Sequence, residues 1–216
     1  MERQLVTTWR AVPGMAPLAL PPTYKFMRSS VMTLRNECYT SRTFRKVHIE
    51  HASCPGDLEV VHHVAFPHCT HNIPILGVDV VSKKGYPTMA IADVSGDAPW
   101  ALADAVWRVQ QQHTMHIYKR RVLPAWGTDI FSASCVFLDS PNPLIFQLYV
   151  KDLLKVYIDY AATQHPSCTH VEKRTEEQRR YCMHQLQNDR TRSLLVKAFG
   201  AEMADGYMRD VMFDCV

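Results

Sequence analysis

The sequence lacks the features by which most cofactor proteins are identified. It has 8 glycines in 216 residues, and none forms a GxGxxG phosphate-binding loop, so bound flavin or nicotinamide has no support. The seven cysteines include no CxxC pair and are odd in number, and we interpret them as reduced thiols. No apolar run approaches the roughly 18 residues that span a bilayer. The N-terminus also lacks the basic and then apolar layout of a secretory signal.

The chain also has little excess of charge of either sign. With 24 basic and 21 acidic residues the net charge is +3, which argues against general nucleic-acid binding. The basic residues are nonetheless clustered, at Lys119, Arg120 and Arg121, and at Arg174, Arg179, Arg180, Arg190 and Arg192. Such patches suit an acidic protein or a ligand that bears carboxylates, although a solvated helix face explains them equally well.

The first half of the chain is rich in short β-branched runs. From about Val31 these runs are separated by turn signals such as Pro55-Gly56 and Lys84-Gly85, and such short links favour an antiparallel meander. Four prolines interrupt residues 1–30, so we expect an irregular N-terminal segment there. Residues 31–216 are predicted to form a single domain.

The second half is mainly helical. We expect helices over 101–118, after the Ser140-Pro-Asn-Pro sequence, from a Thr175/Gln178 capping box to Gly200, and over 201–213, with a short strand within 133–138. Helices before and after the last strand would cover both faces of the sheet. The predicted fold is therefore an α/β protein, a three-layer α/β/α sandwich around a central antiparallel sheet.

Ionisable residues interrupt the predicted strands at four places: Glu50, His62, Asp79 and Asp93. An ionisable group on a buried sheet face is costly unless it is paired or useful. Alternation along the runs allows His62 and Asp79 to share a face, where burial and coupling would bring their pKa values together. A buried structural histidine remains the alternative to a proton-handling pocket.

Two other kinds of site have weaker support. Histidines and cysteines come close together at His68, Cys69 and His71, and again at His165, Cys168 and His170. These spacings match no structural zinc pattern, and surface histidines in loops explain them, so we predict no metal site. No cysteine stands at a recognisable nucleophile position beside a histidine.

Several long motifs resemble those of the ferredoxin-dependent bilin reductases. They are NECYTSRTFRKVHIE, the VVHHVAFP run, NIPILGVDVVS, MAIADVSG, LPAWG followed by IFS, and YCMHQLQNDRTRSLLVKAFG with its trailing MADGYMRDVMFD. The resemblance covers about Leu34 to Asp214 and implies the same α/β/α fold. The chain departs from the usual pattern in a WGTDIFS loop one residue longer, and in Arg190 where a lysine is common.

The resemblance also implies roles for particular residues. It places the catalytic acid–base residues at Glu50, His62 and Asp79, a combination similar to the phycocyanobilin-forming subgroup. It places anchors for the substrate's propionates at Arg121 and Arg190. Thr88, Asn188 and Asp189 are implied to line or flank the same pocket.

The implied activity is reduction of biliverdin IXα to phycocyanobilin by four electrons and four protons. The electrons would come singly from reduced 2Fe-2S ferredoxin, with no cofactor bound to the protein. We expect a monomer without nucleic-acid or membrane partners, in the cytoplasm of a cyanobacterium or the plastid stroma of an alga. A bilin reductase of different regiospecificity, forming phycoerythrobilin or phytochromobilin, and a non-catalytic bilin-binding protein remain the alternatives.

Overall fold

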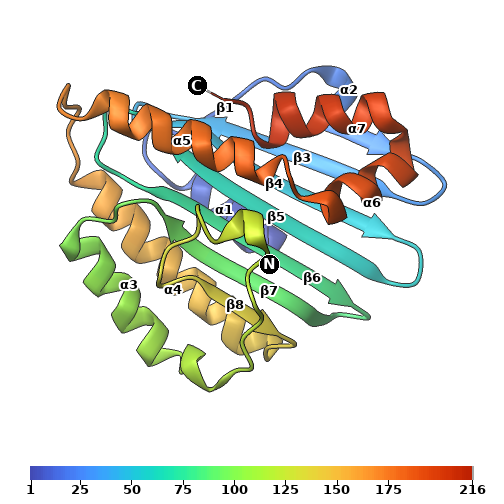
Figure 1. Cartoon of the computed structure of the whole chain (residues 1–216), viewed down its shortest axis with the longest axis horizontal. Helices are drawn as coiled ribbons and strands as arrows, with labels where there is room; N and C mark the ends of the chain where they lie inside the picture. Colours follow the sequence, from blue (N-terminus) through green and yellow to red (C-terminus); the bar gives the residue numbers. More distant parts are fainter. Residues whose placement is uncertain (216) are drawn as a thin grey trace.

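A single antiparallel sheet forms the centre of the molecule, whose residues 1–215 are described by the computed structural model (Figure 1). Within these residues the strands are β1 (Ala16–Pro17), β2 (Phe26–Arg28), β3 (Thr33–Thr40), β4 (Phe44–Cys54), β5 (Leu58–Pro67), β6 (Ile75–Lys83), β7 (Tyr86–Ser95) and β8 (Val136–Asp139). They follow the spatial order β1-β3-β4-β5-β6-β7-β8, and β2 pairs with β3 as well. The long strands β3 to β7 therefore form the predicted meander.

Two of the predicted turns close hairpins of this meander. Gly56 and Asp57 have φ values of +80° and +58° between β4 and β5, and Lys84 and Gly85 have +52° and +79° between β6 and β7. Two successive residues with positive φ form a turn whose twist matches that of the flanking strands, which explains why glycine stands in each.

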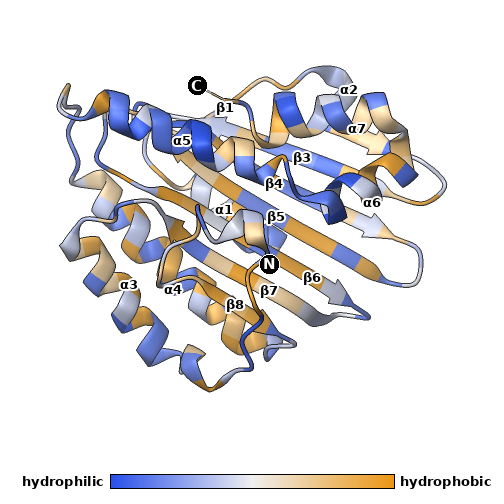
Figure 2. Cartoon of the chain, in the orientation of Figure 1, coloured by the Kyte–Doolittle hydropathy of each residue, from blue (hydrophilic) through white to orange (hydrophobic). Residues whose placement is uncertain are grey.

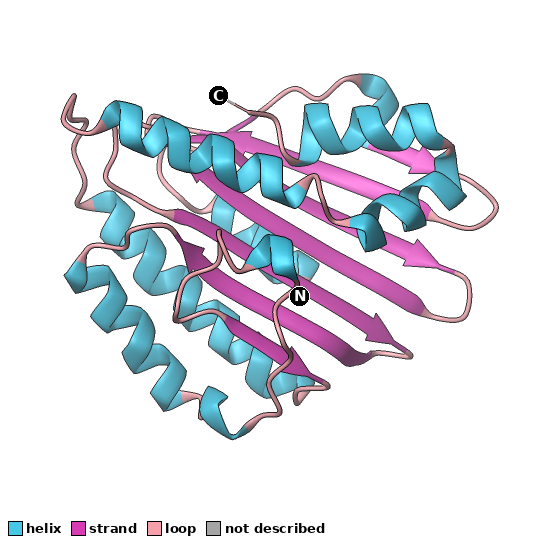
Figure 3. Cartoon of the chain, in the orientation of Figure 1, coloured by secondary structure: helices cyan, strands magenta, loops and turns pink. Residues whose placement is uncertain are grey.

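Helices cover both faces of the sheet (Figures 1 and 3). One layer contains α1 (Glu2–Arg10), α3 (Trp100–Gln112) and α4 (Pro143–Ala162). The other contains α5 (Val171–Gln185), α6 (Asp189–Phe199), α7 (Ala201–Tyr207) and the π-helix η3 (Met208–Met212). Short helices at α2 (Pro22–Lys25), η1 (Met115–Ile117) and η2 (Ala125–Gly127) complete the described elements. The predicted three-layer sandwich is confirmed.

Strand alternation divides the interior into two cores. On β4 and β5, Val47, Ile49 and Ala65 face the layer of α1, α3 and α4. Ala52 and Val64 face the layer of α5, α6 and α7. Figure 2 shows the apolar bands along the strands and the mostly hydrophilic outer surface of α5. No helix within residues 1–215 is long and apolar enough to cross a membrane.

The prediction of an irregular segment over residues 1–30 was wrong. Residues 2–10 form α1, and its Leu5 and Trp9 side chains are completely buried in the core beneath the sheet. Burying a large aromatic side chain stabilises such a helix far more than its own propensity does. Residue 31 is therefore not a boundary between loose and folded chain, and Val216 lies outside the described residues.

The prediction of one helix from Thr175 to Gly200 was also wrong. Two helices occupy this range. The first of them, α5, already begins at Val171, so Thr175 lies inside it, and its hydroxyl donates to the Val171 carbonyl oxygen instead of capping the helix. Helix α5 ends at Gln185. The Asn188 side chain then accepts a hydrogen bond from the Thr191 backbone N–H and caps the start of α6. An asparagine cap followed by Asp189 in the first turn is a typical helix start.

Candidate functional site

Four polar side chains form a row across the middle of the sheet. The register pairs Asn36 on β3 with Glu50 on β4, and Glu50 with His62 on β5. His62 in turn pairs with Asp79 on β6. Side chains directly opposite one another are about 5 Å apart, and alternation places this row on the face covered by α5, α6 and α7. The predicted shared face of His62 and Asp79 is confirmed.

His62 and Asp79 are in direct contact. Nδ1 of His62 lies 2.6 Å from Oδ1 of Asp79, and the two side chains are 7% and 33% exposed. Burial lowers the pKa of His62, but the charge and hydrogen bond of Asp79 and the charge of Glu50 outweigh it and raise that pKa above its ordinary value. His62 is thus suited to hold a proton between the two carboxyl groups. Its buried Nε2 atom has no hydrogen-bond partner within residues 1–215.

Glu50 is the most enclosed carboxyl group of the row. Its side chain is buried, and Tyr207 at the end of α7 places its hydroxyl oxygen 2.5 Å from Oε2. Burial raises the pKa of Glu50, whereas the charge of His62 and the Tyr207 hydrogen bond lower it, and the net direction is upward. The site therefore increases the proton affinity of both groups, that of Glu50 through burial and that of His62 through Asp79 and Glu50.

Asn36, the outermost residue of the row, is in contact with His48 on β4. The Asn36 amide nitrogen donates to the Tyr24 carbonyl oxygen at 2.6 Å, so its Oδ1 atom faces His48 as an acceptor. Nε2 of His48, 2.8 Å away, carries the proton that it donates there. Burial, together with the charges of His62 and Lys46, lowers the pKa of His48 well below its ordinary value, so the ring is neutral.

His63, the next residue after His62, belongs to the opposite face. Its Nε2 atom accepts a hydrogen bond from Nε1 of Trp9 at 3.1 Å, and its Nδ1 atom donates to the His48 carbonyl oxygen at 2.9 Å. Burial lowers the pKa of His63 to about 4. Adjacent histidines on one strand thus have opposite protonation tendencies, and only His62 is placed for proton transfer.

Asn36, His48 and Tyr207 were missed in the sequence, although each has a signal there. His48 stands two residues before Glu50 in FRKVHIE, a spacing that puts both on one face of a strand. Asn36 opens the NECY motif, and Tyr207 lies within MADGYMRD. The contact of Tyr207 with Glu50 joins residues 157 positions apart, which no local pattern predicts.

Asp93 is a buried carboxylate with a structural environment. It accepts hydrogen bonds from the backbone N–H of Ser132 at 3.0 Å and from the hydroxyls of Ser132 and Ser95, each at 2.5 Å. Burial raises the pKa of Asp93 and these hydrogen bonds oppose the rise. It attaches the WGTDIFS loop to β7, and its side-chain hydrogen bonds within residues 1–215 go to Ser95 and Ser132 and not to the row.

Thr88 and Arg121 lie together beyond the row, at the junction of β7 and β8. The guanidinium of Arg121 donates to the Thr88 carbonyl oxygen at 3.0 Å and to Oδ1 of Asp139 at 3.2 Å. The Thr88 hydroxyl donates to the Val81 carbonyl oxygen at 3.1 Å. Lys119 pairs with the same Asp139 carboxylate, and these two cations lower the pKa of Asp139.

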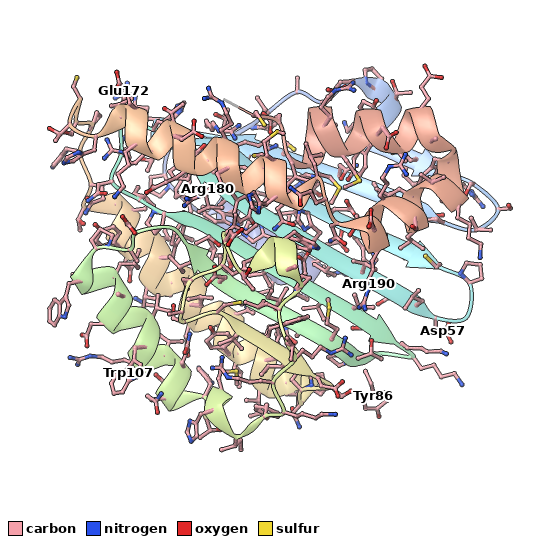
Figure 4. All side chains as sticks on the ribbon, in the orientation of Figure 1. Asp57, Tyr86, Trp107, Glu172, Arg180 and Arg190 are labelled. Carbon is pink, nitrogen blue, oxygen red and sulfur yellow. The ribbon has the colours of Figure 1, made fainter. Side chains whose placement is uncertain are left out.

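Asn188, Asp189 and Arg190 lie at the start of α6. Asn188 serves as the helix cap, and Asp189 and Arg190 are exposed. In the view of Figure 4, Arg190 projects from α6 across β5 and β6. The structure therefore brings His62 and Asp79 into direct contact and places Glu50 opposite His62 on the next strand, whereas the binding candidates lie in two separate places, beside β7 and β8 and at the start of α6.

The arrangement can exchange protons but contains no metal-binding cluster. Within residues 1–215 no group of three or more His, Cys, Asp or Glu side chains is arranged to hold a metal ion. Two carboxyl groups that flank a histidine provide separate proton donors at one buried place.

The fold and the sequence belong to a known class of oxidoreductase. The sequence model of the family "ferredoxin-dependent bilin reductase" matches residues 2–214, nearly the whole chain. The chain belongs to this family, and it is an oxidoreductase that uses ferredoxin as its electron donor.

Individual relatives agree with this assignment. The chain is 34% identical over 97% of its length to a phycocyanobilin:ferredoxin oxidoreductase of Gloeobacter violaceus, of which 87% is covered. It is 30% identical over 99% of its length to the enzyme of that name from Trichodesmium erythraeum, of which 91% is covered. The fold matches a crystal structure of tomato phytochromobilin synthase in complex with biliverdin with a TM-score of 0.79, at 14% identity, over 98% of this chain and 80% of that one.

Proposed function

We propose that this chain reduces biliverdin IXα to phycocyanobilin, using four electrons from ferredoxin and four protons. The observation that carries the proposal is the contiguous row of Glu50, His62 and Asp79 in a chain that matches phycocyanobilin-forming relatives over almost its whole length. The conjugated tetrapyrrole itself accommodates single electrons, so no cofactor bound to the protein is required. The protein's contribution is then to place protons.

The three acid–base groups have separate roles in this proposal. Asp79, a third exposed, protonates the bilin, and His62 shares and relays that proton through the 2.6 Å contact. Glu50, which is enclosed and whose pKa is raised by burial, protonates the D-ring vinyl group. Distinct proton affinities within one row allow protons to be delivered at different stages.

The two arginines would bind the substrate's propionates. A guanidinium binds carboxylate through two parallel hydrogen bonds, and Arg190 is exposed at the start of α6. Arg121 already contacts the Asp139 carboxylate, so a propionate there competes with or joins that pair. Thr88, Asn188 and Asp189 would line or flank the same pocket.

The two clusters of basic residues found in the sequence, one at 119–121 and one within 174–192, would also bind ferredoxin, whose acidic surface carries a 2Fe-2S cluster. Complementary charges steer the two proteins together, and this attraction weakens as the salt concentration increases. The cyanobacterial origin of the relatives supports a location in the cytoplasm of a cyanobacterium. The plastid stroma of an alga is the other location in this proposal, and the chain is proposed to act as a monomer.

The test is anaerobic incubation of the protein with biliverdin IXα, ferredoxin and a reducing system, followed by absorbance and chromatography. We expect phycocyanobilin from the wild type and loss of turnover in Asp79→Asn. Asp104→Asn is the matched control and should retain activity, because Asp104 on α3 is 29% exposed, similar to Asp79, and pairs with Arg108 away from the row. A product of another absorption spectrum would indicate different regiospecificity, and binding without conversion would indicate a carrier.

A further inference from the structure

Tyr207 lies between two hydrogen-bond acceptors and cannot donate to both at the same time. Its hydroxyl oxygen lies 2.5 Å from Oε2 of Glu50 and 2.6 Å from Oδ1 of Asn36. A tyrosine hydroxyl carries one proton, so it donates to one of these oxygens at a time. The amide of Asn36 is fixed by its donation to the Tyr24 carbonyl oxygen, so Oδ1 remains an acceptor in every state.

Two hydrogen-bond arrangements satisfy this geometry. When Glu50 is neutral, its own O–H donates to the Tyr207 oxygen, and Tyr207 donates to Asn36. When Glu50 is charged, the Tyr207 hydroxyl donates to the carboxylate, and Asn36 still accepts from Nε2 of His48 at 2.8 Å. No buried polar atom of this group loses its partner in either state, which makes the exchange inexpensive.

We propose that Tyr207 is a positioning residue that turns its hydroxyl from Asn36 to Glu50 when Glu50 gives up its proton. This inference rests on the proposed function and deepens it. In the step concerned, the bilin takes one electron from reduced ferredoxin and one proton from Glu50. The carboxyl O–H bond breaks, a C–H bond forms on the vinyl group, and the negative charge that remains on Glu50 receives the Tyr207 hydrogen bond.

The surroundings leave Tyr207 as the donor that can respond to this charge. The ionisable groups around Glu50 and Tyr207 are His62 on β5, Asp79 on β6, His48 on β4, Cys38 on β3 and Tyr24 on α2. His62 donates to Asp79, and His48 donates to Asn36. Within residues 1–215 the Glu50 side chain has one hydrogen bond, the one from Tyr207.

The experiment compares Tyr207→Phe with Tyr157→Phe. Tyr157 is also completely buried and donates one hydrogen bond, to the Pro74 carbonyl oxygen at 2.7 Å, but it lies in the opposite core. The titration of Glu50 is followed through the infrared C=O band of its neutral acid, identified by its loss in Glu50→Gln. Turnover and product composition are measured as functions of pH on the same proteins.

Removing the Tyr207 hydroxyl takes a hydrogen bond from both forms of Glu50. The bond to the charged carboxylate is the stronger of the two, so the charged form loses more and the pKa of Glu50 rises. We expect the infrared midpoint of Tyr207→Phe to move up by about one pH unit, and the Glu50-dependent step to slow about tenfold. The KM for biliverdin should stay within about twofold, and a two-electron intermediate should accumulate. Tyr157→Phe should show neither the shift nor the intermediate.

A second variant tests the other acceptor. Asn36→Ala removes the oxygen that accepts from Tyr207 when Glu50 is neutral, so the midpoint should move down instead of up. Equal midpoints in wild type and Tyr207→Phe, or a shift of the same sign in both variants, would overturn the inference. A wild type without ferredoxin-dependent turnover would refute the proposed function instead, and the infrared titration would still test Tyr207.

Discussion

Replacement of Asp79 by asparagine is expected to lower the pKa of His62 by about one pH unit. A hydrogen bond to a charged group contributes about 1.5–3 kcal/mol. Because the Asp79 side chain is 33% exposed, water screens the pair and the lower end applies. About 1.5 kcal/mol corresponds to about one pH unit. Asparagine keeps an oxygen that accepts from Nδ1 of His62, so the shift reports the lost charge.

The measurement is nuclear magnetic resonance of the histidine ring nitrogens as a function of pH, with His62 assigned through His62→Gln. His63 serves as the internal control, since burial lowers its pKa to about 4 and its partners, Trp9 and the His48 carbonyl, lie away from Asp79. Its ring should stay neutral from about pH 5.5 upward in both proteins. If His62 titrates at the same pH with and without the Asp79 charge, the reasoning is refuted.

The same shift has a consequence for stability. The folded pKa of His62 is raised, so its protonation stabilises the fold fully below the unfolded value of about 6.5, and this contribution is lost as the pH rises through the folded pKa. The advantage of the wild type over Asp79→Asn in free energy of unfolding should therefore be largest near pH 6 and shrink toward alkaline pH. Urea unfolding at several pH values measures it.

Two further substitutions test the supports of the site. Trp9→Phe removes the donor to His63 and leaves a buried ring nitrogen without a partner. The free energy of unfolding measured in urea should therefore fall by about 1–3 kcal/mol. An unchanged free energy of unfolding would contradict a role for α1 in the core. Ser132→Ala removes a hydroxyl that donates to Asp93 and should raise the pKa of this carboxyl further. A raised acid pKa lowers the free energy of unfolding as the pH rises above the unfolded pKa of about 3.9. The free energy of unfolding of Ser132→Ala should therefore fall further below that of the wild type at pH 7 than at pH 4. Equal differences at the two pH values would contradict this account.

The strand half of the fold and the central pair of the site could be predicted because they depend on local patterns. Alternation in the runs around His62 and Asp79 determines which face each side chain occupies, and turn residues such as Lys84-Gly85 determine which strands are neighbours. In the structure, Nδ1 of His62 and Oδ1 of Asp79 lie 2.6 Å apart, as this shared face allows.

The remaining features depend on contacts that a local pattern does not contain. The prolines of the first 30 residues suggested loops, but the core recruits α1 through Trp9, which hydrogen bonds to a residue 54 positions away. Asn188 was interpreted as a pocket residue, and its equally good fit as a helix cap was overlooked. Tyr207 is recognisable only once α7 is seen to lie against Glu50.

The adjacent histidines of β5 also tie the register of this strand to contacts on both faces of the sheet. A slip by one residue in one direction would put Val64 in the place of His63, and Trp9 would lose its acceptor. A slip in the other direction would put Val61 in the place of His62, and Asp79 would lose its donor. Either misalignment would thus leave a polar group without its partner, so the residues of the site also specify the pairing of the strands that carry it.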